Sequence, residues 1–302
     1  MPRRIRRIFL ALVTLSAGAA LAQPGQPAQP TPAQPTPAQP TPAQPAQRLD
    51  LPFPSPHGSV TQKVGLTELS VAYSSPGVKG RKIWGDVVPY GQLWRAGANE
   101  CTKVTFSTAV SIEGKPVPAG AYCIFLLPEK SGWTFILSKN TEGGTGDYKQ
   151  SEDALRVRAT TTAIPLRERM AFTILDFDDE KGTLAMEWEK LRVGVKFTTG
   201  TREKVLAQIR ALQGNDWRPY NGAARYLFMA GIEPALAMQL VDRSIQLKEE
   251  WSNVWTRAQL LHAAGKKTEA LAAAQRAQTL GKSSDNFFAS DDVAKALVSW
   301  KK

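Results

Sequence analysis

The apolar pattern of the chain changes its period near residue 200, and this change restricts the fold to two parts. Before residue 200, short runs alternate apolar and polar residues, as half-buried strands do. After it, apolar residues recur at the spacing of an amphipathic helix. Because a sheet face and a helical stripe bury their apolar residues differently, we expect two units. They are a β domain over residues 48–200 and a helical module over residues 201–302.

The β part shows about nine or ten alternating runs, separated by turns rich in Gly and Pro. The runs cover residues 60–64, 69–73, 103–112, 121–127, 133–137, 155–159, 170–175, 183–188 and 193–197. Short strands with such turns are typical of antiparallel sandwiches and jelly rolls. The predicted fold class is therefore mainly β plus α, with an antiparallel β-sandwich or jelly-roll-like domain followed by a C-terminal α-helical module.

The helical part repeats itself at a spacing of 34 residues. Residues of the same or similar type stand 34 apart in the pairs Trp217 and Trp251, Ala224 and Ala258, Leu227 and Leu261, and Gly231 and Gly265. This period resembles that of tetratricopeptide repeats, which are helix–turn–helix units. The repeats predict helices over residues 217–230, 233–247, 251–264 and 267–280.

Two such repeats rarely bury enough surface to be stable alone. Further helices near residues 202–213 and 291–300 are therefore expected to cap the stack, or the module docks on the β domain. The repeats either carry a peptide-binding groove for a protein partner or form a structural appendage. The sequence leaves both interpretations open.

The first 22 residues have the three parts of a secretory signal peptide. Residues 3–7 supply four arginines, residues 8–20 are apolar, and Ala20-Leu21-Ala22 predicts cleavage between Ala22 and Gln23. The apolar part is shorter than the ~20 residues that span a bilayer. We expect a periplasmic or secreted protein with no membrane insertion after cleavage. Arg6-Arg7 followed by Phe9-Leu10 partly matches a twin-arginine signal, so the export route stays open.

Residues 23–47 repeat a T-P-A-Q-P unit and contain nine of the 21 prolines, but no charged or aromatic residue. Such a segment cannot form a core, so we expect a disordered Pro/Ala/Gln-rich linker. Proline favours extended polyproline II, and ~3.1 Å per residue gives a reach of roughly 80 Å. The segment is either a spacer that holds the domains away from a surface or a low-complexity tail that arose by sequence drift.

The charge of the chain is moderately basic. The formal net charge is +11, and removing the four arginines of the signal leaves 34 basic and 27 acidic residues, a net charge of +7. The basic residues are scattered among the acidic ones. A nucleic-acid partner is therefore not expected, because it would require a clustered basic surface.

Few residues of the chain are suited to catalysis. The two histidines, His57 and His262, form no H-x-x-H pattern, and G-x-S-x-G, P-loop and G-x-G-x-x-G motifs are absent. The sequence therefore predicts no metal site, no cofactor and no catalytic residue.

Cys101 and Cys123 are the two cysteines of the chain, and each begins an apolar run. The two runs are expected to pair in one sheet. In an oxidising compartment such a pair usually forms a disulfide, which would contribute ~3 kcal/mol. Two buried thiols are the alternative.

Residues 78–100 fit neither a helix nor a strand period and are rich in glycine and aromatic residues. The segment reads V-K-G-R-K-I-W-G-D-V-V-P-Y-G-Q-L-W-R-A-G-A-N-E. A segment of this composition is an ordered loop that either defines the fold or recognises a ligand. The candidate residues are Arg81, Trp84, Asp86, Tyr90, Trp94, Arg95, Asn99 and Glu100.

Two interpretations of this loop are open. In the first, arginine forks and aromatic rings bind a small anionic or saccharide ligand. In the second, Trp84 and Trp94 fill the core, and Arg95 pairs with Glu100 or Asp86 to lock the loop. The lock predicts that Glu100→Gln destabilises the fold by more than ~2 kcal/mol, as when one partner of a buried pair is removed.

The same loop resembles the signature of an exported bacterial family called domain of unknown function 2911. Further agreement comes from residues 62–65, 71–74, 117–122 and 153–157, so the resemblance covers about residues 55–198. It implies export and a β-sandwich, but no established activity. The chain departs from the family at Ser75, where an arginine is usual, in the reduced 143–148 segment, and at Cys101 and Cys123, where small residues are commoner.

Two functional hypotheses follow. The first is a non-catalytic ligand-binding or scaffold protein of the cell envelope with a helical protein-interaction module. The second is an envelope hydrolase that acts on a saccharide or ester through Glu100 and Arg95. The absence of histidine, serine and metal motifs favours the first.

Overall fold

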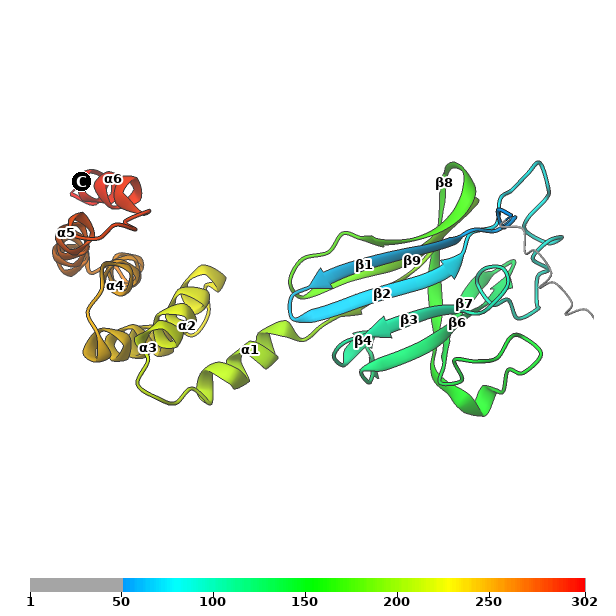
Figure 1. Cartoon of the computed structure of the whole chain (residues 1–302), viewed down its shortest axis with the longest axis horizontal. Coiled ribbons are helices and arrows are strands. Elements are labelled where there is room, and N and C mark those ends of the chain that lie inside the picture. Colours follow the sequence, from blue (N-terminus) through cyan, green and yellow to red (C-terminus); the bar gives the residue numbers. More distant parts are fainter. Residues whose placement is uncertain (1–50, 302) are drawn as a thin grey trace, which may run out of the picture. The chain divides into compact units, whose positions relative to one another are not determined.

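A computed structural model describes residues 51–301 of the chain. The signal peptide, its cleavage site at Ala22 and Gln23, and the linker 23–47 lie outside the described residues. Within them, nine antiparallel strands are followed by six α-helices (Figure 1). The strands are β1 (His57–Val64), β2 (Thr67–Ser74), β3 (Thr102–Phe106), β4 (Val110–Ile112), β5 (Lys115–Val117), β6 (Gly120–Glu129), β7 (Gly132–Ser138), β8 (Asp153–Leu175) and β9 (Lys181–Thr198).

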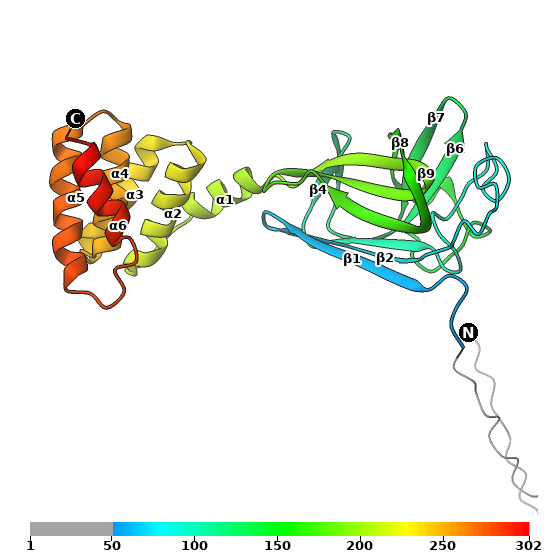
Figure 2. The same cartoon turned by 90° about the horizontal axis from the view of Figure 1, so that it is seen from above.

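The strands form one sheet in the order β1-β2-β3-β6-β7-β8-β9-β4-β5, and this sheet folds over on itself. The fold occurs at the long strand β8, whose first part, up to Ala159, pairs with β7, whereas the part from Thr160 onwards pairs with β9. Figure 2 shows β1 and β2 on one side of the domain and β8 and β9 on the other. The predicted β-sandwich-like domain is therefore confirmed.

The strand boundaries differ from the prediction in three places. The run 103–112 is two strands, because the chain turns at Ser107–Ala109, so that β3 pairs with β2 and β6 while β4 pairs with β5 and β9. The runs 155–159 and 170–175 belong to the single strand β8, and 183–188 and 193–197 to β9. Nearly all of residues 160–169 are exposed, so no apolar alternation marks them as strand.

The core of the β domain lies between the two halves of the folded sheet. Alternate residues of the strands point into it, as the period of two requires. Its largest fully buried side chains are Trp188, Phe106 and Phe197. The core is continuous from β1 to β9, and it also includes apolar residues of the loop between β2 and β3.

The helices are α1 (Thr201–Arg210), α2 (Trp217–Ala230), α3 (Pro234–Leu247), α4 (Trp251–Ala263), α5 (Lys267–Lys282) and α6 (Ser290–Ser299). Helix α2 has capping residues at both of its ends. Asp216 accepts a hydrogen bond from the backbone N–H of Arg218 at the start of α2, and Gly231 ends that helix with a φ of 65°. Pro234 begins α3 at a position where its missing N–H costs nothing.

The helical module is packed through small side chains. Ala224 and Ala258, which stand 34 residues apart, are both fully buried, as are Ala237, Ala270 and Ala274. Alanine at these positions lets neighbouring helices approach closely. Among residues 51–301, no helix is sufficiently long and apolar to cross a bilayer.

Candidate functional site

The loop between β2 and β3 contains the predicted segment 78–100 and contributes several buried apolar side chains to the core. Val78, Ile83, Val88 and Ala96 are buried in the core of the β domain. Trp94 exchanges two backbone hydrogen bonds of 2.8 Å with Leu126 of β6. The segment is therefore an ordered cover fixed to the sheet.

Four tryptophans meet here, two from this cover, one from β7 and one from β9. The ring centroid of Trp84 lies 5.0 Å from that of Trp133, 5.7 Å from that of Trp188 and 6.0 Å from that of Trp94. Trp94 in turn stacks on Trp188 at 5.8 Å. Edge-to-face aromatic pairs contribute about 0.5–1.5 kcal/mol each beyond their buried area. Trp84 and Trp94 are partly buried and pack against the core.

The polar candidates of the loop do not form the predicted lock. None of the ion pairs within residues 51–301 includes Arg95, Asp86 or Glu100. Asp86 and Glu100 are exposed, since each lies on a solvent-facing turn. The ion pair of Arg95 with Glu100 or Asp86 is therefore absent among residues 51–301.

The other candidates have local structural contacts. The Arg81 guanidinium donates hydrogen bonds to the carbonyl oxygens of Gly77 (2.6 Å) and Val78 (3.2 Å). Asn99 Nδ2 donates to Ser74 Oγ at 3.2 Å. The Tyr90 side chain is 39% exposed. These contacts hold the loop in shape, and they do not bring Arg95, Asn99 and Glu100 together.

Three hydrogen-bond donors under the loop have no acceptor among the described residues. They are Trp84 Nε1, Trp188 Nε1 and the Nε of Arg95, whose side chain is half-buried. Because all three are donors, a group bound there would have to be an acceptor. The ring contacts of the tryptophans leave this cluster closely packed.

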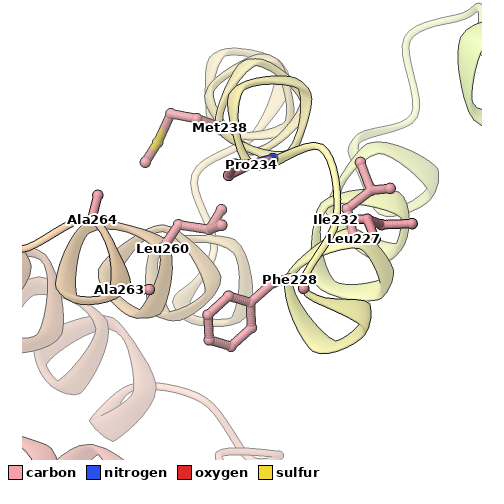
Figure 3. A pocket seen from close by; sticks show the side chains of 9 residues that line it. Leu227, Phe228, Ile232, Pro234, Met238, Leu260, Ala263 and Ala264 are labelled. Carbon is pink, nitrogen blue, oxygen red and sulfur yellow. The ribbon is translucent and has the colours of Figure 1, made fainter.

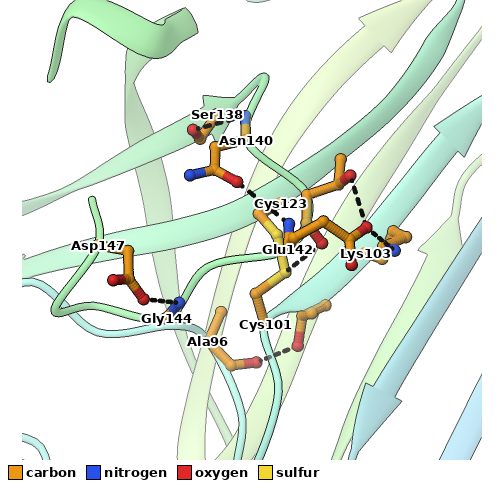
Figure 4. The surroundings of a disulfide bond; sticks show 11 residues. Ala96, Cys101, Lys103, Cys123, Ser138, Asn140, Glu142, Gly144 and Asp147 are labelled. Atoms are coloured by element: carbon orange, nitrogen blue, oxygen red, sulfur yellow. Dashed lines mark hydrogen bonds and ion pairs between the residues drawn. A yellow bond between two sulfur atoms is a disulfide. The ribbon is translucent and has the colours of Figure 1, made fainter. Parts of the chain in front are cut away.

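A disulfide joins the end of the loop to the sheet (Figure 4). Cys101 immediately precedes β3, and Cys123 lies on β6 opposite Lys103. The two Cα atoms are 5.7 Å apart, so the two runs pair as the sequence predicted. Cys123 also packs with Phe125 and Ile136 in a small buried cluster of its own.

The Tyr148 side chain covers this small cluster. A hydrogen bond to the Asp153 carboxylate, which also pairs with Arg156, holds it in place. Its ring lies 5.2 Å from that of Phe125, and its hydroxyl donates to the Asp153 carboxylate at 2.9 Å. Arg156 Nε also donates to that carboxylate, at 3.0 Å. Burial and the Asp153 hydrogen bond raise the pKa of Tyr148. The polar groups of Tyr148, Asp153 and Arg156 are hydrogen-bonded to one another, and these bonds stabilise the segment before β8.

The helical module presents a more open site. A hollow of about 340 Å³ lies along α2, α4 and α6. Phe288 and Met229 at this hollow are 75% and 73% exposed. Its lining residues are Asn221, Arg225, Phe228, Met229, Trp251, Ser252, Trp255, Thr256, Gln259, Phe288, Ala289 and Asp292. We call this surface the α2/α4/α6 groove.

A second hollow adjoins the groove. It has a volume of about 350 Å³ and lies between the α2–α3 turn and the end of α4. Phe228 lines both hollows, and Figure 3 shows Phe228 and Leu260 projecting into the space between α2 and α4. Its other lining side chains, among them Ile232, Pro234 and Met238, are apolar.

Residues 55–197 match the family described as Protein of unknown function (DUF2911). The β domain is the matched part, and the predicted resemblance over about residues 55–198 is confirmed. The match ends before α1, so the tetratricopeptide-like character of the helices stays a prediction. No curated protein and no solved structure matches the chain.

Within the matched residues 55–197, the departure at Ser75 has a structural explanation. Ser75 Oγ donates to the Met170 carbonyl at 2.6 Å, and Arg169 donates to the Ser75 carbonyl at 3.1 Å. Serine therefore ties the start of the loop to β8. In the part of the chain that the structure describes, no three His, Cys, Asp or Glu side chains gather closely enough to hold a metal ion.

The sequence indicated candidate residues in the loop 78–100. It did not indicate the residues that line the α2/α4/α6 groove. A signal was present in α2, where Asn221, Arg225 and Phe228 follow one another at spacings of four and three. Residues at these spacings share one helix face. That mixed polar and apolar face could have indicated a recognition surface.

Proposed function

We propose that the protein is a non-catalytic binding or scaffold protein of the cell envelope, with the binding function in its helical module. The observation that carries this proposal is the α2/α4/α6 groove, where Phe288 and Met229 are mostly exposed beside side chains that can form hydrogen bonds. Aromatic residues, Met and Arg are enriched where proteins bind one another. The β domain would act as a stable platform.

The polar lining of the groove favours an extended peptide as the ligand. Asn221 and Gln259 carry amides, which can donate to and accept from a peptide backbone. Arg225, which takes part in none of the ion pairs of residues 51–301, supplies further donors.

The proposed location is the periplasm or the exterior of the cell. It is supported by the signal-like first 22 residues and by the disulfide of Cys101 and Cys123, since disulfides persist in oxidising compartments. A hydrolase acting through Glu100 and Arg95 has less support. Glu100 is exposed, and no hydrogen bond within residues 51–301 joins it to Arg95.

An array of synthetic peptides of uncharged, acidic and basic composition tests the proposed function. Phe288→Asp, which places a charge in the groove, is expected to lower peptide binding at least about tenfold, an effect of ~1.4 kcal/mol. The matched control is Leu166→Asp, because Leu166 is also an exposed apolar residue, 60% exposed, but lies on β8. Equal peptide binding by both variants would contradict the proposal.

A further inference from the structure

We propose that the second hollow of the helical module, between the α2–α3 turn and the end of α4, binds one large apolar side chain of the peptide that occupies the α2/α4/α6 groove. We call it the α2/α4 hollow, and we call the side chain that fills it the anchor. This inference rests on the proposed function, because it names the feature by which the groove would select a peptide: a Leu, Met or Phe side chain.

The α2/α4 hollow is apolar throughout. None of its lining side chains carries a nitrogen or oxygen atom. Leu227 and Leu260 are its most buried lining residues, at 0% and 5% exposed, whereas Phe228, Ile232 and Met238 are half-buried (Figure 3). An apolar side chain that enters this hollow leaves water without covering any polar side chain of the protein, so its transfer is favourable.

The mouth of the hollow is surrounded by exposed residues with short side chains. Gly231, Pro234, Ala263 and Ala264 line it and are all exposed. A Cβ added at Gly231 would meet no atom within 4 Å. Because these residues are small, a side chain of a ligand can enter the hollow from solvent.

The volume of the hollow suits one side chain of a peptide. It measures about 350 Å³. An apolar cavity of about 150 Å³ already holds one benzene molecule. The α2/α4 hollow therefore has room for a Leu, Met or Phe side chain together with the backbone atoms next to it.

The division of polar and apolar groups favours an anchor on a peptide over a free small molecule. Sites for small molecules combine apolar walls with a few polar groups that fix the orientation of the ligand, and the side chains of the hollow supply none. Such groups lie in the adjoining groove, where Ser252 and Gln259 are half-buried and Arg225 is exposed. Phe228 lines both spaces, so one peptide can place its backbone in the groove and its anchor in the hollow.

The backbone at the mouth also suits a peptide. Helix α2 ends at Ala230 and α4 ends at Ala263, and the last carbonyl groups of a helix have no partner within it. The Leu227 carbonyl accepts from the Ile232 N–H at 3.1 Å, but no hydrogen bond within residues 51–301 reaches the carbonyls of Met229 and Ala230. The backbone N–H groups beside an anchor can donate to such carbonyls, whereas a hydrocarbon or acyl chain has no donor.

The test uses the array peptides in labelled pairs that differ at one position, Leu in one member and Ala in the other. Fluorescence anisotropy measures their binding to the chain without its first 22 residues. In at least one pair we expect the Leu member to bind at least about tenfold more tightly, because its side chain becomes buried. Equal affinity of the two members in every pair would overturn the proposal.

Two variants that fill the hollow locate the anchor site. Ala264→Phe and, independently, Ala263→Phe place a ring at its mouth, so the preference for the Leu member should fall to within about twofold. The Ala member should bind these variants as it binds the unchanged protein. The matched control is Ala272→Phe, because Ala272 is also exposed but lines the hollow between α3, α4 and α5. An undiminished preference for Leu in both filled variants contradicts the inference.

Nuclear magnetic resonance gives a readout that does not depend on the variants. In the unchanged protein, the methyl groups of the bound Leu member should show nuclear Overhauser contacts to Ile232 and Met238, which both line the hollow. Circular dichroism checks that each variant is folded. Contacts to Phe288 of the groove without contacts to Ile232 or Met238 would overturn the proposal.

The inference can fail while the proposed function stands. If array peptides lose binding on Phe288→Asp but no pair prefers Leu, the groove is a peptide site without an anchor, and only the inference fails. If no array peptide responds to Phe288→Asp, the proposed function fails as well. If indole alone shifts the methyl signal of Ile232 while no pair prefers Leu, the hollow is a site for free apolar molecules, which also overturns the inference.

Discussion

The β domain and the helical module use aromatic residues in opposite ways. In the β domain, Trp84, Trp94, Trp133 and Trp188 contact one another and close the core. In the module, Phe288 contacts Trp251 at 4.7 Å between ring centroids, yet it stays 75% exposed. The comparison teaches that a segment rich in aromatic residues can be structural, whereas a binding site needs apolar side chains that remain accessible.

The β domain and the α2/α4/α6 groove also differ in whether their charged side chains form ion pairs. In the β domain, the Glu187 carboxylate is buried and receives hydrogen bonds from Arg167 (2.8 Å) and Arg192 (2.7 Å). In the α2/α4/α6 groove, Arg225 and Asp292 take part in none of the ion pairs within residues 51–301. Charges that are already paired stabilise a fold, and charges without protein partners can contribute to recognition.

The largest predicted effect concerns the tryptophan cluster. Trp188 is 1% exposed and contacts both Trp84 and Trp94, so Trp188→Ala should destabilise the β domain by about 3–5 kcal/mol. Phe288→Ala in the groove should stay within about 0.5 kcal/mol, because the side chain is mostly exposed. Urea unfolding monitored by near-ultraviolet circular dichroism makes the comparison. A large loss for Phe288→Ala would show that the groove aromatics are structural too.

The second prediction concerns the disulfide. Replacing both Cys101 and Cys123 by Ser should cost about 3 kcal/mol, because the unfolded chain regains the entropy of a loop closed over a sequence separation of 22 residues. The same urea experiment measures it, with reductant added to the unchanged protein as a parallel arm. If neither treatment shifts the midpoint, the bond contributes nothing to the stability of the β domain.

A smaller effect is expected from the ion pair between Arg276 of α5 and Glu249, which lies between α3 and α4. Arg276 donates to Glu249 at 3.2 Å through Nε, and this hydrogen bond holds the pKa of Glu249 below its ordinary value of 4.5. A depressed carboxylate pKa stabilises the fold above the unfolded pKa, and the gain is lost as pH falls through the folded pKa. Since the Glu249 side chain is 38% exposed, Glu249→Gln should cost only about 0.5 kcal/mol at neutral pH.

Melting curves of the Glu249→Gln variant and the unchanged protein across pH test this sign. The difference in melting temperature should shrink as pH falls below 4.5 and vanish below the depressed pKa. If the difference in melting temperature grows as the pH falls, the lowered pKa of Glu249 is contradicted.

The smallest effect is predicted for Glu100. The internal lock inferred from sequence required a loss of more than ~2 kcal/mol for Glu100→Gln. The structure leaves this side chain exposed and without an ion pair among residues 51–301, so the change should stay within about 0.5 kcal/mol. Thermal melting of the variant decides between the two values.

The sequence predicted the elements with strong local signals. The bounds of α2 agree with the predicted helix because its 34-residue spacing, its Asp216 cap and Gly231 all indicate the same ends. The sequence did not predict that β8 is one continuous strand, because residues 160–169 are mostly exposed and show no apolar periodicity. The split of the 103–112 run into β3 and β4 depends on tertiary pairing, which a local pattern does not contain.

The candidate site was harder to predict than the fold. Trp84 and Trp94 were identified as possible core residues, but the expected pairing of Arg95 with Glu100 or Asp86 does not form among residues 51–301. The α2/α4/α6 groove combines side chains from three helices that are far apart in sequence. Only the packing of those helices brings Asn221, Gln259 and Asp292 to one surface.

Hydrogen–deuterium exchange tests the central claim most directly. The protein is compared with and without a saturating amount of the best-binding array peptide. We predict slower exchange in α2, α4 and α6, because the α2/α4/α6 groove binds the peptide. Exchange in residues 78–100 should be unchanged, because this loop does not bind the peptide. Slower exchange confined to residues 78–100, with α2, α4 and α6 unchanged, would contradict the account.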